Sequence, residues 1–367
     1  MPLKLGRTLF KTTERLLNVQ KNFLKGPLNL FPSSSVPFIA APKRPDPQTR
    51  GRWKRHVFIS PAMNKQPLLS KLDYYTFTPS PTSTRPSTQD MPLVVMLHGC
   101  TQNAYSFAQG TQMNRVAQAN GFVVVYPQQS KRYQLNSCWR WFLPDERRGL
   151  AEADTIMEII DTTISMYRLD PEKVFIAGLS AGAAMASLVA MRHPERFCAL
   201  AMHSGPILGK AHSLATGLEI MRAEELEETE ELLEHLSEYE PQHFNLPTMI
   251  IHGEQDNVVN SSNAQQLATQ FLHLNDMPIE TEPSISHRYA QTSREYMHKS
   301  YKYKRQTVVE LVEVKHLDHA WSGGDDSLAY NSRKGPNSSK LVWNFFKRCA
   351  RQYDIRKIEQ EPLPDID

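Results

Sequence analysis

The sequence predicts an α/β fold, with a mostly parallel central sheet and helices on both faces. Short apolar runs, such as residues 92–99, 122–127 and 173–178, alternate with stretches of helical periodicity. Runs that are apolar at nearly every position are typical of parallel strands, because crossover helices bury both faces of such a sheet. With 367 residues, 40% of them apolar, the chain is long enough to enclose a large core.

Eight strands are expected along the chain. The first two contain aromatic and β-branched residues and precede a polar loop, and the other six are the apolar runs of the parallel sheet. In chain order they cover 53–60, 71–80, 92–99, 122–127, 173–178, 197–205, 247–253 and 307–314.

Six helices are expected in the main part of the chain, between and after these strands. The first ends at Gly121, because glycine commonly follows the last helical residue. The second is amphipathic, and the fourth is an acidic insertion. In chain order the helices cover 103–120, 151–168, 181–192, 219–239, 261–274 and 338–352.

The start of the chain predicts a further, basic amphipathic helix over residues 3–25. Apolar residues repeat every seven positions, and six Lys or Arg side chains take the opposite face. The repeating apolar residues are Leu3, Phe10, Leu17 and Leu24. Such a helix lies on an interface, or it packs on the body of the protein or on a second copy. Residues 1–55 carry 12 basic and 2 acidic residues, so a basic arm precedes a body with 30 basic and 37 acidic residues.

The composition limits the classes of protein that the sequence fits. No apolar stretch reaches 18 residues, so no transmembrane segment is expected. The first 26 residues lack the apolar run of a signal peptide, and the four cysteines fit neither a zinc site nor a disulfide-rich scaffold. We therefore expect a cytoplasmic protein, with secretion as the alternative, and no metal, cofactor or nucleic-acid partner. The expected regions are a helix over 1–26, a Pro-rich linker over 27–50, a main domain over 51–353 and a loose acidic tail over 354–367.

The segment Gly178-Leu179-Ser180-Ala181-Gly182 lies between an expected strand and an expected helix. A sharp strand-to-helix turn with flanking glycines presents a serine hydroxyl above the sheet. The following helix N-terminus favours negative charge that develops there. This context predicts that Ser180 is a nucleophile rather than a packing residue.

A serine nucleophile needs a base and an acid, which follow it in the chain in this kind of fold. His319 and Asp256 each follow a strand, at the sheet edge where ligands bind. His319 would accept the proton of Ser180, and Asp256 would fix the tautomer of His319. The alternatives that stay open are the bases His316 and His252 and the acids Asp154, Asp318 and Asp325.

The tetrahedral oxyanion requires two donors. The amide of Ala181, which follows the nucleophile, should supply one of them. The segment "LHGCTQN" follows an early strand and places the amide of Cys100 to supply the other. His98 in the same segment is expected to be structural.

Five segments in order, "PLVVMLHGCTQNAYSFA", "NSCWRWF", "GLSAGAAMA", "HGEQDNVV" and "DHAWSGG", resemble the polyhydroxybutyrate depolymerase family of esterases with a type 1 catalytic domain. The similarity covers residues 50–350. It implies an α/β-hydrolase fold, hydrolysis of short-chain (R)-3-hydroxyalkanoate polyesters, and Ser180, Asp256 and His319 as a catalytic triad. The sequence departs from the family at Ala183, where relatives have glycine, and in its acidic insertion over 219–239.

Three tryptophans, Trp139, Trp141 and Trp321, belong to segments expected near the serine, where flat apolar rings suit a polyester. Core packing is their alternative role. Cys100 and Cys138 lie in loops expected to approach each other. A disulfide between them stays open for an oxidising compartment, and reduced thiols are expected for a cytoplasmic enzyme.

Two alternatives to a polyester depolymerase stay open. Feruloyl and acetylxylan esterases resemble the same family and would use the same triad. A non-catalytic, granule-associated protein on a hydrolase fold is the other alternative. The basic helix over 3–25 would hold a depolymerase, or the non-catalytic protein, on an intracellular polyhydroxyalkanoate granule.

Overall fold

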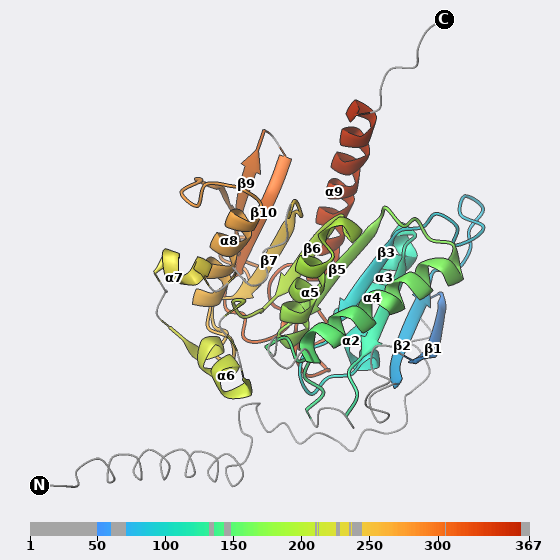
Figure 1. Cartoon of the computed structure of the whole chain (residues 1–367), viewed down its shortest axis with the longest axis horizontal. Coiled ribbons are helices and arrows are strands. Elements are labelled where there is room, and N and C mark those ends of the chain that lie inside the picture. The colour runs from blue at the N-terminus through green and yellow to red at the C-terminus, as the bar shows by residue number, and fades with distance from the viewer. Residues whose placement is uncertain are drawn as a thin grey trace, which may run out of the picture. The chain divides into compact units, whose positions relative to one another are not determined.

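A ten-stranded sheet organises the fold (Figure 1). Its strand order is β1-β2-β4-β3-β5-β6-β7-β10-β9-β8. The six central strands, from β4 to β10, are parallel to one another, and antiparallel strands extend the sheet at both edges. The prediction of a mostly parallel sheet is confirmed. The strands of the sheet are β1 (Arg52–Ile59), β2 (Lys71–Thr78), β3 (Leu93–Leu97), β4 (Val123–Gln128), β5 (Val174–Leu179), β6 (Ala199–His203), β7 (Thr248–Gly253), β8 (Ser284–Arg288), β9 (Tyr296–Tyr303) and β10 (Gln306–Val314).

Helices cover both faces of this sheet (Figure 1). Helices α4, α5 and α8 pack on one face, with side chains such as Leu93 and Val95 of β3. Helices α2, α3 and α9 pack on the other face, with the alternate residues Val94 and Met96. The helices are α2 (Ala104–Thr111), α3 (Met113–Asn120), α4 (Arg148–Tyr167), α5 (Ala181–Arg192), α6 (Leu214–Arg222), α7 (Thr229–Glu234), α8 (Ser262–Leu274) and α9 (Ser338–Gln360).

The computed structural model describes most of the main domain. The helix expected over 1–26 and nearly all of the linker expected over 27–50 lie outside the described residues, so they stay predictions. The described residues are 50–59, 71–131, 136–142, 148–209, 211, 213–224, 228–234, 236, 244–304 and 306–360. Among them, no helix has the length and apolar character needed to cross a membrane.

Three differences from the expected elements have physical reasons. The helix expected over 103–120 is two helices, because Gln112 takes a left-handed conformation with φ of 55° and ends α2. The described part of the acidic insertion expected as one helix holds the end of α6 and the whole of α7, because Ala223 leaves the helical conformation, with ψ of 122°, and ends α6. The antiparallel strands β8 and β9 were not expected, because they are half-exposed and rich in polar residues and so carry no apolar run.

Candidate active site

Ser180 occupies a sharp turn between strand and helix. Strand β5 ends at Leu179 and helix α5 begins at Ala181, so Ser180 alone connects them. Its φ of 57° and ψ of −125° lie in a region that residues other than glycine rarely adopt. The amide of Ser180 donates to the carbonyl of His203 at 2.9 Å, which ties the turn to the neighbouring strand β6. The predicted strand–turn–helix context of this serine is confirmed.

The two glycines that flank Ser180 allow this turn to form. A Cβ on Gly178 would lie 2.1 Å from the carbonyl oxygen of Gly182. A Cβ on Gly182 would lie 2.2 Å from the carbonyl oxygen of Leu97 in β3. Both distances are far below van der Waals contact. The glycines therefore let α5 start close to the sheet and leave Ser180 at the carboxyl end of the strands.

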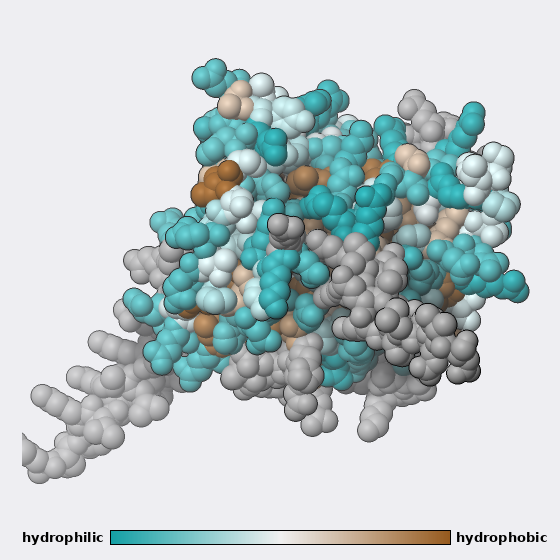
Figure 2. Space-filling view, turned by 90° about the horizontal axis from the view of Figure 1, so that it is seen from above, coloured by the Kyte–Doolittle hydropathy of each residue, from teal (hydrophilic) through white to brown (hydrophobic). Residues whose placement is uncertain are grey.

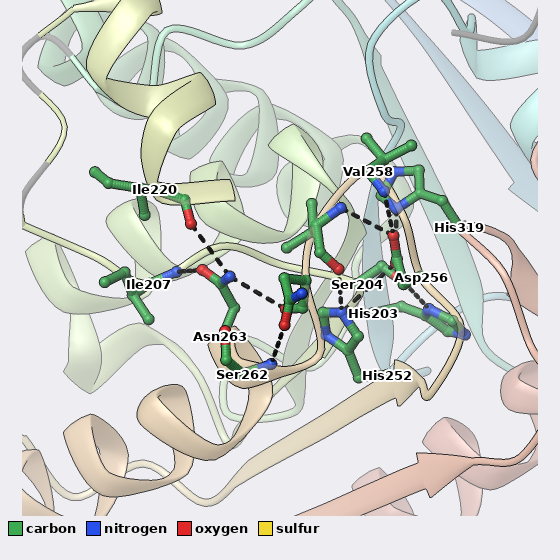
Figure 3. A network of polar contacts seen from close by, with 12 residues as sticks. His203, Ser204, Ile207, Ile220, His252, Asp256, Val258, Ser262, Asn263 and His319 are labelled. Carbon is green, nitrogen blue, oxygen red and sulfur yellow. Dashed lines mark hydrogen bonds and ion pairs between the residues drawn. The ribbon is translucent and has the colours of Figure 1, made fainter. Parts of the chain in front are cut away.

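Asp256 and His319 form a buried pair beyond the ends of β7 and β10. His319 Nδ1 lies 2.8 Å from Asp256 Oδ2 (Figure 3). The other carboxylate oxygen, Oδ1, accepts hydrogen bonds from the amides of Val258 at 3.0 Å and Val259 at 2.9 Å. Burial raises the pKa of Asp256, but the adjacent His319 and the hydrogen bonds outweigh burial and lower this pKa to about 2. Asp256 is therefore ionised at neutral pH, holds a proton on Nδ1 of His319 and leaves Nε2 as the acceptor.

The alternative bases have other surroundings. His252 is buried, and its Nε2 donates to the carbonyl of Val259 at 2.8 Å. Burial lowers the pKa of His252, so it is a neutral ring that packs beneath Asp256, with 3.5 Å between His252 Nε2 and Asp256 Oδ2 (Figure 3). His316 is exposed and has a left-handed backbone with φ of 59°. Neither ring is paired with a carboxylate through Nδ1, as His319 is.

The alternative acids lie at the surface. Asp154 on α4 forms an ion pair with Arg192 on α5 at 2.5 Å. Asp318 is exposed, and Asp325 accepts hydrogen bonds from the amide and the hydroxyl of Ser327. Among the described residues, the carboxylate that pairs with His319 is therefore that of Asp256 and not that of any of the three alternative acids.

The amides of the loop after β3 differ in their partners. The amide of Gly99 donates to Gln102 Oε1 at 2.9 Å, and those of Thr101 and Gln102 donate to backbone carbonyls. Within the part of the chain that the structure describes, the amide of Cys100 donates to none. The amide of Ala181 is at the first position of α5, where no carbonyl of the same helix can accept it. These are the two amides that the sequence predicts as oxyanion donors.

The loop after β3, the serine turn and the His319 loop meet at the same place. A Cβ on Gly99 would lie 3.5 Å from the Cβ of Ser180. Thr101 Oγ1 donates to the hydroxyl of Tyr330 at 2.9 Å. The ring of Tyr330 in turn faces His319 edge-on, with 6.4 Å between the ring centroids. The three predicted catalytic residues therefore share one edge of the sheet, and their roles remain predictions.

The expectation of reduced thiols at Cys100 and Cys138 is wrong, because the structure joins them in a disulfide. The approach of their two loops agrees with the sequence analysis. Reduced thiols are expected there because the predicted location is the cytoplasm. Cys198 and Cys349 are buried. The disulfide attaches the segment around Cys138 to the loop that carries the amide of Cys100.

Two of the three tryptophans predicted as substrate contacts are fully buried. Trp139 is fully buried and donates through Nε1 to the carbonyl of His98 at 3.0 Å. Trp321 is 1% exposed and donates to the hydroxyl of Ser339 at 3.2 Å. Burial of this kind favours the alternative role of core packing, and a substrate contact by either ring stays a prediction. Trp141 is 8% exposed, and its role as a substrate contact stays a prediction.

His203 is a residue of the site that sequence analysis missed. Its Nε2 accepts a hydrogen bond from the amide of Ser322 at 3.2 Å, and its ring stacks on Trp321 with 5.0 Å between centroids. Burial, reinforced by the neighbouring His252 and His319, lowers the pKa of His203 to about 3. His203 is therefore a neutral support that ties the His319 loop to β6 (Figure 3). Its position at the end of an apolar strand was the signal that could have indicated it.

This sheet, with a strained serine turn and a buried His–Asp pair at the carboxyl ends of its strands, defines an α/β hydrolase. The model of the Esterase PHB depolymerase family matches residues 74–297. The chain belongs to this esterase family.

The names of similar proteins state different substrates. The chain is 31% identical over 236 residues to poly(3-hydroxyalkanoate) depolymerase C of Paucimonas lemoignei, which covers 62% of this chain and 54% of that protein. It is 32% identical over 133 residues to feruloyl esterase B of Neurospora crassa, which covers 36% of this chain and 43% of that protein. The chain thus spans about half or less of the length of these curated relatives.

Solved structures support the fold. The acetyl xylan esterase from Aspergillus awamori superimposes with a TM-score of 0.62 and 17% identity, over 80% of this chain and 99% of that one. At this identity the likeness concerns the fold alone. It confirms the predicted α/β-hydrolase fold.

Proposed function

We propose that this chain is a serine esterase that hydrolyses short-chain poly-3-hydroxyalkanoates such as poly-3-hydroxybutyrate. The observation that carries the proposal is the buried His319–Asp256 pair, at 2.8 Å, on the same sheet edge as Ser180 in its strained turn. Ester hydrolysis by this route needs a nucleophile, a base that takes its proton, and donors for the oxyanion. Residues suited to each of these roles lie on adjoining loops.

In the proposed mechanism, Ser180 Oγ attacks the carbonyl carbon of the ester while His319 Nε2 takes its proton. The amides of Cys100 and Ala181 donate to the oxyanion of the tetrahedral intermediate. Collapse of the intermediate breaks the ester C–O bond, and His319 returns the proton to the departing hydroxyl end of the polymer. A water molecule, deprotonated by His319, then attacks the acyl carbon; the bond to Ser180 Oγ breaks, the acid product leaves, and His319 returns the proton to Ser180 Oγ. Asp256 stays ionised throughout and keeps the tautomer of His319 fixed.

A polyester is the substrate class that the comparisons favour. The relative named as a poly(3-hydroxyalkanoate) depolymerase matches 62% of this chain, whereas the probable acetylxylan esterase A of Neosartorya fischeri matches 38% and the feruloyl esterase 36%. The second candidate is therefore an esterase that removes acetyl or feruloyl groups from polysaccharides. The chemistry at Ser180 would be the same for both.

The substrate class is tested by comparing product release from amorphous polyhydroxybutyrate, crystalline polymer, acetylated xylan and methyl ferulate at equal enzyme concentration. We expect soluble 3-hydroxybutyrate products from the amorphous polymer, and none with the Ser180→Ala variant. Faster release of acetate or ferulate than of 3-hydroxybutyrate would favour the second candidate. No hydrolysis of any ester would favour a non-catalytic, granule-associated protein.

We also propose that residues 3–25 attach the enzyme to a polyhydroxyalkanoate granule inside the cell. The support is the repeating apolar residues opposite a basic face in the sequence. Where Figure 2 shows described residues, apolar side chains occur in small groups among hydrophilic ones. A secreted enzyme is the alternative location, and it is the one in which the Cys100–Cys138 disulfide would persist, because extracellular compartments are oxidising.

Attachment is tested by deleting residues 1–26. The rate on soluble 4-nitrophenyl butyrate should stay within twofold of wild type, while co-sedimentation with granules falls at least tenfold. High salt should weaken only the charged part of the binding. Equal sedimentation of the truncated and full-length proteins would overturn the attachment role.

A further inference from the structure

Glu152 is a buried carboxyl group that the proposed mechanism does not use. It lies on α4, and 3% of its surface is exposed. Burial raises the pKa of Glu152 to about 7, although the amide of Arg140, the Gln129 side chain and the charge of Arg140 each oppose this. A buried carboxyl group is costly to the fold, so its partners indicate what it holds in place.

Both oxygens of Glu152 accept hydrogen bonds. Oε2 accepts from the amide of Arg140 at 2.9 Å, and Oε1 accepts from Gln129 Nε2 at 2.9 Å. The same Nε2 group also lies 3.2 Å from the carbonyl oxygen of Cys138. Glu152 therefore fixes the short segment Cys138–Arg140 at two points, once directly and once through Gln129.

This segment and Gln129 are connected to the loop of the predicted oxyanion donor by three links. Cys138 forms the disulfide with Cys100. Trp139 Nε1 donates to the carbonyl of His98 at 3.0 Å, two residues before Cys100. The amide of Gln129 donates to His98 Nε2 at 3.1 Å, while His98 Nδ1 lies 2.8 Å from the carbonyl oxygen of Gly99.

We propose that Glu152 is a positioning residue for oxyanion stabilisation: by fixing Cys138–Arg140 and Gln129, it sets the place of the Cys100 amide. The proposal rests on the proposed function, because it assigns that amide to the oxyanion. A carboxylate suits this position since both partners are N–H donors. A glutamine at this position would turn its own NH₂ group toward either the amide of Arg140 or Nε2 of Gln129. Two donors would then face each other, and the residue that carries the opposing donor would move.

The test replaces Glu152 with glutamine, which keeps the shape of the side chain. Removal of one oxyanion donor costs about 10²–10³ in kcat, so displacement of a donor should cost about tenfold. We expect kcat on 4-nitrophenyl butyrate to fall about tenfold with KM within twofold, because the oxyanion forms only in the transition state. The Ki of butylboronic acid, whose adduct places an oxygen where the oxyanion forms, should rise by a similar factor. The control is Glu158→Gln, the same change on the same helix outside this network.

If Glu152→Gln melts at or above the melting temperature of wild type, its lower kcat comes from a misplaced oxyanion donor and not from a damaged fold. If Glu152→Gln does not fold, Gln129→Met serves in its place, because it removes the link to Cys138 and leaves the Arg140 bond. A folded variant with kcat and Ki within twofold of wild type overturns the proposal, and so does failure of both variants to fold. Wild-type protein without activity on the soluble ester would overturn the proposed function itself, whereas an active wild type with an unaffected variant overturns only the role of Glu152.

Discussion

Replacing Asp256 with asparagine tests the His–Asp pair through the tautomer of His319. The amides of Val258 and Val259 both donate to Oδ1 at 3.0 and 2.9 Å, so the only oxygen of the asparagine side chain must take this place. Its NH₂ group then faces Nδ1 of His319, which in the wild type donates to Oδ2 at 2.8 Å. His319 must then accept at Nδ1 and carry its proton on Nε2, where it cannot accept the proton of Ser180.

The same tautomer change in a serine protease costs about 10⁴ in kcat, which corresponds to about 5 kcal/mol in activation free energy. We therefore expect Asp256→Asn to lower kcat on 4-nitrophenyl butyrate by about 10⁴ at pH 7, with far-UV circular dichroism unchanged. The control is Asp154→Asn, which breaks a surface ion pair with Arg192 and should keep activity within twofold. Asp256→Asn with more than a tenth of wild-type kcat, or a damaging Asp154→Asn, would show that the acid is misassigned.

Three further predictions concern stability. Glu152 has a pKa of about 7 in the folded protein against 4.5 in the unfolded chain, so the folded protein binds the proton more tightly. The free energy of unfolding of wild type, compared with that of Glu152→Gln, should therefore fall by about 3 kcal/mol between pH 4.5 and 7. A difference between the two proteins that does not change with pH in urea titrations would contradict this. Cys138→Ser opens a disulfide that spans 38 residues and should cost about 3–4 kcal/mol, whereas no change in melting temperature would argue against a bond to Cys100. Gly182→Ala places a Cβ 2.2 Å from the Leu97 carbonyl and should abolish soluble folded protein or activity, and a fully active variant would contradict the close packing of the turn.

The parallel sheet and the serine turn could be predicted because each depends on local sequence. Apolar runs between amphipathic stretches indicate buried strands wherever they occur, and helix α5 has the bounds that the sequence predicts. Strands β8 and β9 could not be predicted in this way, because they lie at an edge of the sheet and their burial depends on tertiary pairing with β10.

In the site, sequence order and strand ends located Asp256 and His319, which the structure pairs. Glu152 and His203 were missed because their importance comes from burial and from partners far away in the chain. Trp139 and Trp321 were placed correctly near the site, but the direction of each ring depends on packing that no local pattern encodes.

The central claim is that Ser180 is the nucleophile of an esterase. The most direct measurement is the intact mass of the protein after incubation with diisopropyl fluorophosphate, followed by peptide mapping of the adduct. We predict one diisopropylphosphoryl group per chain, on Ser180, with complete loss of esterase activity and no adduct on Ser180→Ala. An unmodified wild-type protein that retains activity, or a stoichiometric adduct on another residue, would contradict the account.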